Sequence, residues 1–181
     1  MIQFVLTREY FNHLATFGEL REPETGFRCK TIERIPPKMG DTPTQRSKKA
    51  RPCGVYDLRH VYLPMENRNT FELIKAGVYS KACFQMIRLQ NAGDIVLARA
   101  TNGTLYAAES EVVLNVVDRF IMEKIMSGEL PSRPRRGYVQ LLITEDAGYG
   151  KVLPSKESLQ QEREEEPVNW DLVDDDWWDN L

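Results

Sequence analysis

Short segments in which apolar and polar residues alternate recur through the first 150 residues, and they restrict the possible folds more than any other feature. In residues 2–8, Ile2, Phe4 and Leu6 occupy every second position. A period of two places such side chains on one face of a half-buried strand. Residues 27–34 alternate in the same way, so the N-terminal part is expected to form a meander of strands.

Further strands and one hairpin are expected along the same stretch. The remaining strand-like segments are residues 55–62, 71–74, 83–89, 94–100, 104–107 and 138–144. Asn102-Gly103 is a strong signal for a tight turn, because both residues tolerate a positive φ. We therefore expect residues 95–100 and 105–108 to pair as an antiparallel hairpin.

One segment has the period of a helix instead. Between residues 110 and 127 the apolar residues recur at spacings of three and four, at Val113, Leu114, Val117, Phe120, Ile121 and Ile125. Ser110 is a candidate N-cap, and Gly128 is a candidate C-terminal stop. Together these patterns predict a mainly β (α+β) fold: one antiparallel, barrel-like or sandwich domain over residues 1–154, with one covering helix at about 110–127.

Residues 36–52 show no periodicity and form a long basic loop. Lys38, Arg46, Lys48, Lys49 and Arg51 are opposed within it by a single acidic residue, Asp41. Loops of this length are usually functional or disordered. Two interpretations therefore remain open, contact with an acidic surface and a solvated insertion.

The cysteines and histidines predict no metal, cofactor or disulfide. Cys29, Cys53 and Cys83 form no C-x-x-C pair, and only His13 and His60 could complete a zinc site. The cysteines are expected to be buried, reduced thiols within strands. The sequence also contains neither an apolar run of about 18 residues nor the pattern of a signal peptide, so no membrane segment is expected.

The C-terminal residues differ sharply from the rest in charge and aromatic content. Residues 157–181 hold ten acidic residues and one basic residue, a net charge of −9, which leaves residues 1–156 with 23 basic and 17 acidic residues, a net charge of +6. Residues 155–169 are a charged linker, and residues 170–181 contain all three tryptophans.

An acidic, tryptophan-rich segment of this kind is typical of a docking peptide, because tryptophan dominates interface energetics and aspartate steers a peptide toward basic surfaces. The partner-binding residues predicted on this basis are Trp170, Leu172, Trp177, Trp178, Leu181, Asp174, Asp175 and Asp176 in the tail, with Lys48, Lys49 and Arg51 in the basic loop. Alternatively, the tail folds back onto the basic loop of its own domain.

Four motifs follow one another in the N-terminal third: Leu6-Thr7-Arg8, residues 16–20 (TFGEL), residues 29–33 (CKTIE) and residues 52–56 (PCGVY). In this order they resemble a domain-of-unknown-function family common in bacteriophages and prophages, whose members show L-x-R, T-x-G-x-L, C-x-T-L-E and P-x-G-x-Y. The residues are mostly structural in kind. Arg8 and Glu33 are expected to form a cross-strand pair on neighbouring strands, weak if it is exposed.

The resemblance also bears on catalysis. Family members continue with I-x-I-H-x-G-N and G-C-I segments, whose histidine and cysteine invite comparison with cysteine transpeptidases that act on cell walls. The equivalent stretch here, residues 84–94, has no histidine, and no cysteine follows Cys83. Cys53 and His60 would lie about 23 Å apart on one extended strand, too far to form a dyad, so no catalytic residue is predicted.

The sequence and the resemblance together favour a non-enzymatic structural or assembly component of a bacteriophage particle, such as a tail, neck or capsid-associated protein. Its partners would be other virion subunits, or copies of itself in a ring, with no nucleic acid and no membrane involved. It would be found in the virion and in the host cytoplasm during assembly. The alternatives are a cysteine-dependent peptidoglycan-processing enzyme or lysis accessory, and a host-directed adaptor or inhibitor.

Overall fold

The structure is a computed structural model that describes residues 1–38, 40–46, 48–75, 82–86, 89–131 and 137–149. The elements in chain order are β1 (Ile2–Phe11), β2 (Thr16–Arg21), β3 (Arg28–Glu33), α1 (Pro43–Arg46), β4 (Gly54–Leu63), the 3-10 turn η1 (Pro64–Glu66), β5 (Arg68–Ile74), β6 (Phe84–Gln85), β7 (Ile95–Ala98), β8 (Ala100–Thr101), β9 (Ala107–Ala108), α2 (Ser110–Met126) and β10 (Val139–Glu145). The predicted tail, residues 170–181, and its linker lie outside the described residues.

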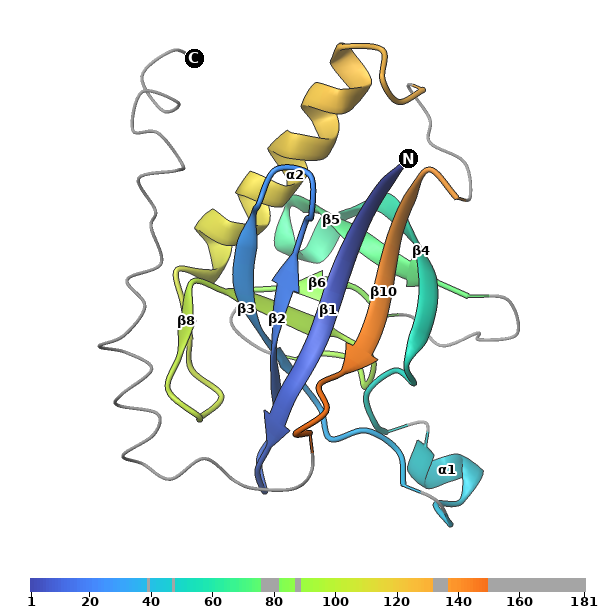
Figure 1. Cartoon of the computed structure of the whole chain (residues 1–181), viewed down its shortest axis with the longest axis vertical. Coiled ribbons are helices and arrows are strands. Elements are labelled where there is room, and N and C mark those ends of the chain that lie inside the picture. The colour runs from blue at the N-terminus through green and yellow to red at the C-terminus, as the bar shows by residue number, and fades with distance from the viewer. Residues whose placement is uncertain (39, 47, 76–81, 87–88, 132–136, 150–181) are drawn as a thin grey trace.

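Eight strands form a nearly closed, barrel-like sheet in the order β5-β4-β10-β1-β2-β3-β7-β6 (Figure 1). The two outermost strands approach each other across the remaining gap. Leu73 N donates to Ala82 O at 2.8 Å, and Thr70 Oγ1 donates to Phe84 O at 2.6 Å. The predicted mainly β, barrel-like class with one principal helix is therefore confirmed.

The meander expected at the N-terminus is present, because β1 pairs antiparallel with β2 and β2 pairs antiparallel with β3. Two other pairings are parallel, so the sheet is mixed and the expectation of a wholly antiparallel domain is wrong in this respect. The last strand, β10, lies parallel to β1, with Ile2 opposite Val139 and Arg8 opposite Glu145. The short strand β6 also runs parallel to β7. The first and last strands of the described chain are thus neighbours in the middle of the sheet.

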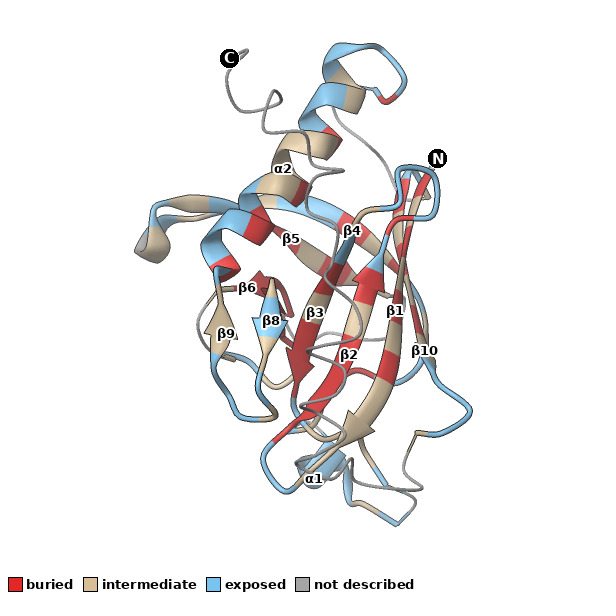
Figure 2. Ribbon diagram, turned by 60° about the vertical axis from the view of Figure 1, so that its left-hand side comes forward, coloured by how far each residue is buried: buried red, intermediate tan, exposed pale blue. Residues whose placement is uncertain are grey.

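The core fills the inside of the barrel, and α2 covers it beside β5, β6 and β7 (Figure 2). Val113, Leu114, Val117 and Ile121 of the helix are buried, as their spacing predicts. Phe120 is partly buried and meets Phe4 of β1 edge to face, with ring centroids 6.2 Å apart. The helix thus buries one apolar face, the arrangement expected of an amphipathic helix on a sheet.

The predicted start of the helix is wrong in one respect. Ser110 is the first helical residue rather than the N-cap, and its buried hydroxyl has no hydrogen-bond partner in the described part of the chain. The capping position is taken by Glu109, in a left-handed conformation with φ of 49°, and its side chain pairs with Arg99. The predicted end is confirmed, since Gly128 follows the helix with φ of 80°.

The predicted hairpin at Asn102-Gly103 is present but shorter than expected. Only Ala100–Thr101 and Ala107–Ala108 pair there. Ile95–Ala98 instead forms β7 in the main sheet, between β3 and β6. All four residues of β7 are buried, so packing on both faces of this strand, rather than the turn, decides its partners.

Candidate functional site

A cluster of polar side chains lies inside one end of the barrel, where an apolar layer would be expected. Burial along β1 alternates so that Ile2, Phe4, Leu6 and Arg8 share the inward face. The row of paired residues at the level of Arg8 is Glu145, Arg8, Gly18 and Thr31, contributed by β10, β1, β2 and β3. The apolar core therefore gives way to charged and hydroxyl groups at the end where β1 and β10 terminate.

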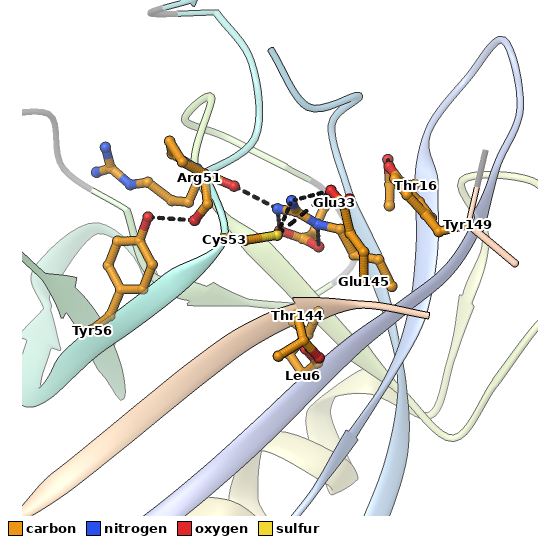
Figure 3. A network of polar contacts seen from close by, with 11 residues as sticks. Leu6, Thr16, Glu33, Arg51, Cys53, Tyr56, Thr144, Glu145 and Tyr149 are labelled. Atoms are coloured by element: carbon orange, nitrogen blue, oxygen red, sulfur yellow. Dashed lines mark hydrogen bonds and ion pairs between the residues drawn. The ribbon is translucent and has the colours of Figure 1, made fainter. Parts of the chain in front are cut away.

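Arg8 is the centre of this cluster, since it contacts four residues that are labelled in Figure 3: Glu33, Arg51, Cys53 and Glu145. Its Nε donates to Glu33 Oε2 at 2.9 Å and its Nη2 to Glu33 Oε1 at 2.8 Å, while Nη2 also donates to the carbonyl oxygen of Arg51 at 2.6 Å. Both charged side chains are only 1% exposed. Burial by itself lowers the pKa of the Arg8 guanidinium, but the hydrogen bond and charge of Glu33 outweigh it and raise that pKa. The pair is therefore held as an ion pair inside the barrel.

The predicted pairing of Arg8 with Glu33 is present, but its expected place on neighbouring strands is wrong. Arg8 lies on β1 and Glu33 on β3, with β2 between them. Gly18 of β2 lies directly opposite Arg8. A Cβ at this position would lie 3.1 Å from Arg8 Cα and 3.2 Å from Thr31 Oγ1. The missing side chain leaves the space through which the guanidinium reaches Glu33.

Replacement of Gly18 by alanine is expected to destabilise the protein by about 3 kcal/mol, the upper end of the usual cost of overpacking a core. The added Cβ would lie 2.4 Å from Thr7 O, a backbone atom that cannot move without disturbing the β1–β2 ladder. The measurement is the free energy of unfolding in urea. Gly148→Ala is the matched control, because its Cβ would meet nothing within 4 Å, and a change below about 0.5 kcal/mol is expected. Equal effects of the two substitutions would contradict this view of Gly18.

Cys53 lies at the solvent-facing side of the cluster, just before β4. The thiol Sγ is 3.7 Å from Arg8 Nη1 and 3.5 Å from Glu145 Oε1. Burial raises the pKa of the Cys53 thiol, and the charge and hydrogen bond of Glu145 raise it further, while Arg8 lowers it. A raised pKa leaves less thiolate, the form that acts as a nucleophile. The expectation of buried thiols holds for Cys29 and Cys83, but it is wrong for the exposed Cys53.

Alkylation of Cys53 by iodoacetamide is therefore expected to need a higher pH than alkylation of a free cysteine. Labelling follows the thiolate fraction, so a raised pKa moves the rate–pH curve upward in pH. In Glu145→Gln the carboxylate charge is gone and the curve is expected to move back down. The measurement is labelling rate against pH by mass spectrometry, in which the buried Cys29 and Cys83 remain unlabelled. Rapid labelling of wild-type Cys53 at neutral pH would show an activated thiol and contradict the expectation.

The histidines lie elsewhere and have other partners. His60 Nε2 is 2.8 Å from Asp118 Oδ1 of α2, and its ring lies 5.2 Å from that of Phe71. His13 is exposed in the turn between β1 and β2. Neither histidine is bonded to Cys53 among the contacts of the described residues. In the same part of the chain, no three histidine, cysteine or acidic residues are grouped as a metal site would require.

The basic loop lies at the same end of the barrel as the Arg8 cluster and contains α1 (Figure 1). Of the binding residues predicted there, Lys48 is exposed, Lys49 is half-buried with its Nζ 3.8 Å from Asp41 Oδ2, and Arg51 is buried. The buried Arg51 contributes its backbone carbonyl to Arg8 and is not part of the exposed surface. No local pattern distinguishes Arg51 from its exposed neighbours, because burial depends on how the loop packs against residues distant in the chain.

The loop exposes more cations than the predicted set. Arg34, Lys38, Arg46 and Lys48 are all exposed, and none forms an ion pair with another described residue. We call these four residues the cationic loop. Arg34 lies just beyond the bounds expected for the loop, directly after β3. Four uncompensated positive charges on one short segment form a surface suited to an acidic partner.

None of the helices in the described ranges is both long and apolar enough to span a bilayer. The eight predicted binding residues of the tail, from Trp170 to Leu181, lie outside the described residues. Comparison of the chain with protein-family models, with curated proteins and with solved structures found no match.

Proposed function

We propose that the protein is a non-enzymatic assembly component of a bacteriophage particle, and that its acidic, tryptophan-rich residues 170–181 dock on the cationic loop of a neighbouring subunit. The observation that carries the proposal is the set of four exposed cations without an ion pair in the described part of the chain. The C-terminal 25 residues carry the complementary net charge of −9.

The polar cluster in the barrel supports a structural role rather than a catalytic one. Its two buried charged side chains, Arg8 and Glu33, form an ion pair with each other. A thiol nucleophile needs a base within hydrogen-bond reach and a lowered pKa. The Glu145 carboxylate is within reach of the Cys53 thiol, but burial and this carboxylate raise the pKa of Cys53 instead of lowering it, and both histidines lie elsewhere.

Contact between the tail of one subunit and the loop of the next is a heterologous contact. Repeated by rotation, such a contact closes into a ring. Residues 150–169 number 20, so if extended they reach up to about 66 Å at about 3.3 Å per residue. A small domain is roughly 30 Å across, and a tail from one subunit can therefore reach the next without rearrangement of the barrel.

The assignment to a phage particle rests on the four N-terminal motifs and their resemblance to a family common in phages and prophages. Two of these motifs provide the central ion pair, Arg8 and Glu33, and a third provides Gly18, which makes room for it. We expect peptides of this protein in purified particles produced by the genome that encodes it, detected by mass spectrometry. Absence from purified particles, together with a monomeric state at all concentrations, would overturn the proposal.

Charge reversal on the cationic loop is expected to abolish self-association while the barrel stays folded. In Arg46→Glu/Lys48→Glu two attractive contacts with the acidic tail become repulsive, and like charges at an interface oppose association. The measurement is the molar mass in solution by light scattering. Arg21→Glu/Arg28→Glu is the matched control, because it reverses two exposed cations at the β2–β3 hairpin. Equal loss of association in both variants would point to net charge rather than to the loop.

A further inference from the structure

Two turns at the end of the barrel where the described chain stops hold apolar side chains in solvent. Leu14, in the turn between β1 and β2, is 43% exposed. Leu105 and Tyr106, in the turn between β8 and β9, are 51% and 66% exposed. We call these three residues the exit patch. Exposed apolar side chains grouped on a surface are typical of interaction sites.

Hydrogen bonds fix the two turns and join them to each other. Asn12 Oδ1 accepts from the backbone N–H groups of Leu14 at 2.8 Å and Ala15 at 3.1 Å. Asn12 Nδ2 donates to Gly103 O in the other turn at 2.7 Å. A single asparagine therefore orders its own turn and holds the β8–β9 turn beside it.

The β8–β9 turn has internal order as well. Asn102 Oδ1 accepts from Thr104 N at 3.2 Å, and Tyr106 N donates to Thr104 Oγ1 at 3.2 Å. Such local bonds hold the turn backbone that carries Leu105 and Tyr106 before any partner arrives. Preorganisation lowers the entropy cost of binding, so the exit patch has the properties of a docking surface rather than of a mobile loop tip.

The chain leaves the barrel next to this patch. The Tyr149 ring lies 5.5 Å from the ring of Phe11, and its Oη is 3.4 Å from Thr16 Oγ1. Phe11 and Thr16 are the residues that flank the turn containing Leu14. Tyr149 is also tied to the end of β10, since its N–H donates to Asp146 O at 2.9 Å. Tyr149, the last described residue, therefore lies beside the β1–β2 turn.

Five other exposed apolar residues lie away from this exit. Met1 and Tyr138 are at the opposite end of the barrel, because Ile2 and Val139 begin β1 and β10. Val112, Met122 and Met126 are on α2. The exit patch therefore combines three features: exposed apolar groups, rigid turns and proximity to the start of the C-terminal segment.

We propose that in the free protomer the exit patch binds residues 170–181 of its own chain, and so keeps the tryptophans of the tail out of solvent until assembly. The tail offers Trp170, Trp177 and Trp178 as large apolar groups to cover the patch. Its aspartates are attracted to the same end of the barrel, where the cationic loop also lies (Figures 1 and 2).

The tether favours a contact within one chain over a contact between chains. A short linker gives the tail an effective concentration in the millimolar range around its own barrel. A neighbouring tail competes only when the protein itself approaches such concentrations, as in a growing assembly. Docking within the chain would therefore delay self-association, and assembly would release the tail to a neighbour by the exchange that underlies domain swapping.

The experiment uses the tryptophan emission of the full-length protein, because all three tryptophans lie in the tail. At concentrations where light scattering shows a monomer, we expect emission shifted to the blue of a synthetic peptide of residues 168–181, and weaker quenching by acrylamide than in that peptide. In Leu105→Ser/Tyr106→Ser the emission and the quenching are expected to match the free peptide. Tyr62→Ser/Val112→Ser is the matched control, because it removes one aromatic and one aliphatic exposed side chain elsewhere, and its emission should stay as in the wild type.

Three results would overturn the inference. Wild-type emission equal to that of the free peptide would mean that the tail is not docked. A blue shift that survives the exit-patch substitutions would place the tail on another surface. A blue shift that disappears on dilution of the wild-type protein would mean that the tail is bound by a neighbour.

Docking of the tail on the exit patch does not depend on the proposed role in a particle, and different results would contradict the two hypotheses. The exit-patch variant keeps the cationic loop and the tail, so with docking relieved it is expected to associate at a lower concentration than the wild type. If the emission results hold but no variant ever associates, the assembly role fails and the intramolecular contact stands. If association depends on the cationic loop while the emission of the wild type equals that of the peptide, the assembly role stands and the intramolecular contact fails.

Discussion

Replacement of Glu33 by glutamine is expected to destabilise the protein by about 3–5 kcal/mol, the usual effect of removing one partner of a buried ion pair. The guanidinium of Arg8 would remain enclosed in the barrel, where the Arg51 carbonyl and the solvent-exposed carboxylate of Glu145, 3.7 Å from Arg8 Nη1, compensate its charge only in part. Native domains are stable by about 5–15 kcal/mol, so this single change removes a large part of the total. With a urea dependence of about 2 kcal/mol per molar, the midpoint of unfolding should fall by about 2 M.

The double variant Arg8→Met/Glu33→Leu separates the cost of an unpaired charge from the value of the pair. Replacement of both buried partners by apolar residues of similar size is often neutral or stabilising. We therefore expect it to unfold near the wild-type midpoint, well above Glu33→Gln. If the double variant were instead as unstable as the single one, the pair would contribute through geometry that apolar side chains cannot replace.

Deletion of residues 168–181 is expected to abolish self-association, the largest functional effect that we predict. The deletion removes all three tryptophans and five of the ten acidic residues of the C-terminal region. A few aromatic side chains usually carry most of the binding free energy of an interface, and the aspartates supply the attraction to the cationic loop. The measurement is molar mass against concentration, with the deletion variant monomeric where the wild type associates.

The same deletion should leave the barrel intact. The apolar core of the described residues is formed by residues 2–143, so the free energy of unfolding of the deletion variant is expected to fall only by about 1 kcal/mol, the amount that docking of the tail on the exit patch would contribute. Substantial destabilisation would show that the tail is part of the folded domain, and loss of association could then no longer be assigned to docking.

The features of the fold that have a local signature could be predicted from the sequence. Alternation in residues 2–8 and 27–34 and the spacing of apolar residues in α2 report directly on which face is buried. The parallel pairing of β1 with β10 has no such signature, because the partners are more than 130 residues apart. β7 was assigned to the wrong pairing for the same reason: the turn after it is a local signal, whereas its burial between β3 and β6 is not.

For the candidate site, the sequence could predict which side chains can pair, but not which of them are buried. Arg8 and Glu33 were expected to pair, but their burial depends on Gly18 in the strand between them. In the sequence, Arg51 is one more cation of a basic loop. The tertiary structure buries it and leaves Arg34 exposed. Residue types thus indicate possible partners, but the exposure that decides their role depends on tertiary contacts.

The most direct test of the assembly role mixes two variants that each lack one half of the proposed contact. The deletion of residues 168–181 keeps the cationic loop but has no tail, and Arg46→Glu/Lys48→Glu keeps the tail but has a reversed loop. Each alone is expected to be monomeric by light scattering. The mixture should form a one-to-one complex that cannot grow further, because each variant offers only one side of the contact. If both variants are folded and the mixture remains monomeric at concentrations where the wild type associates, docking of the tail on the neighbouring cationic loop is contradicted.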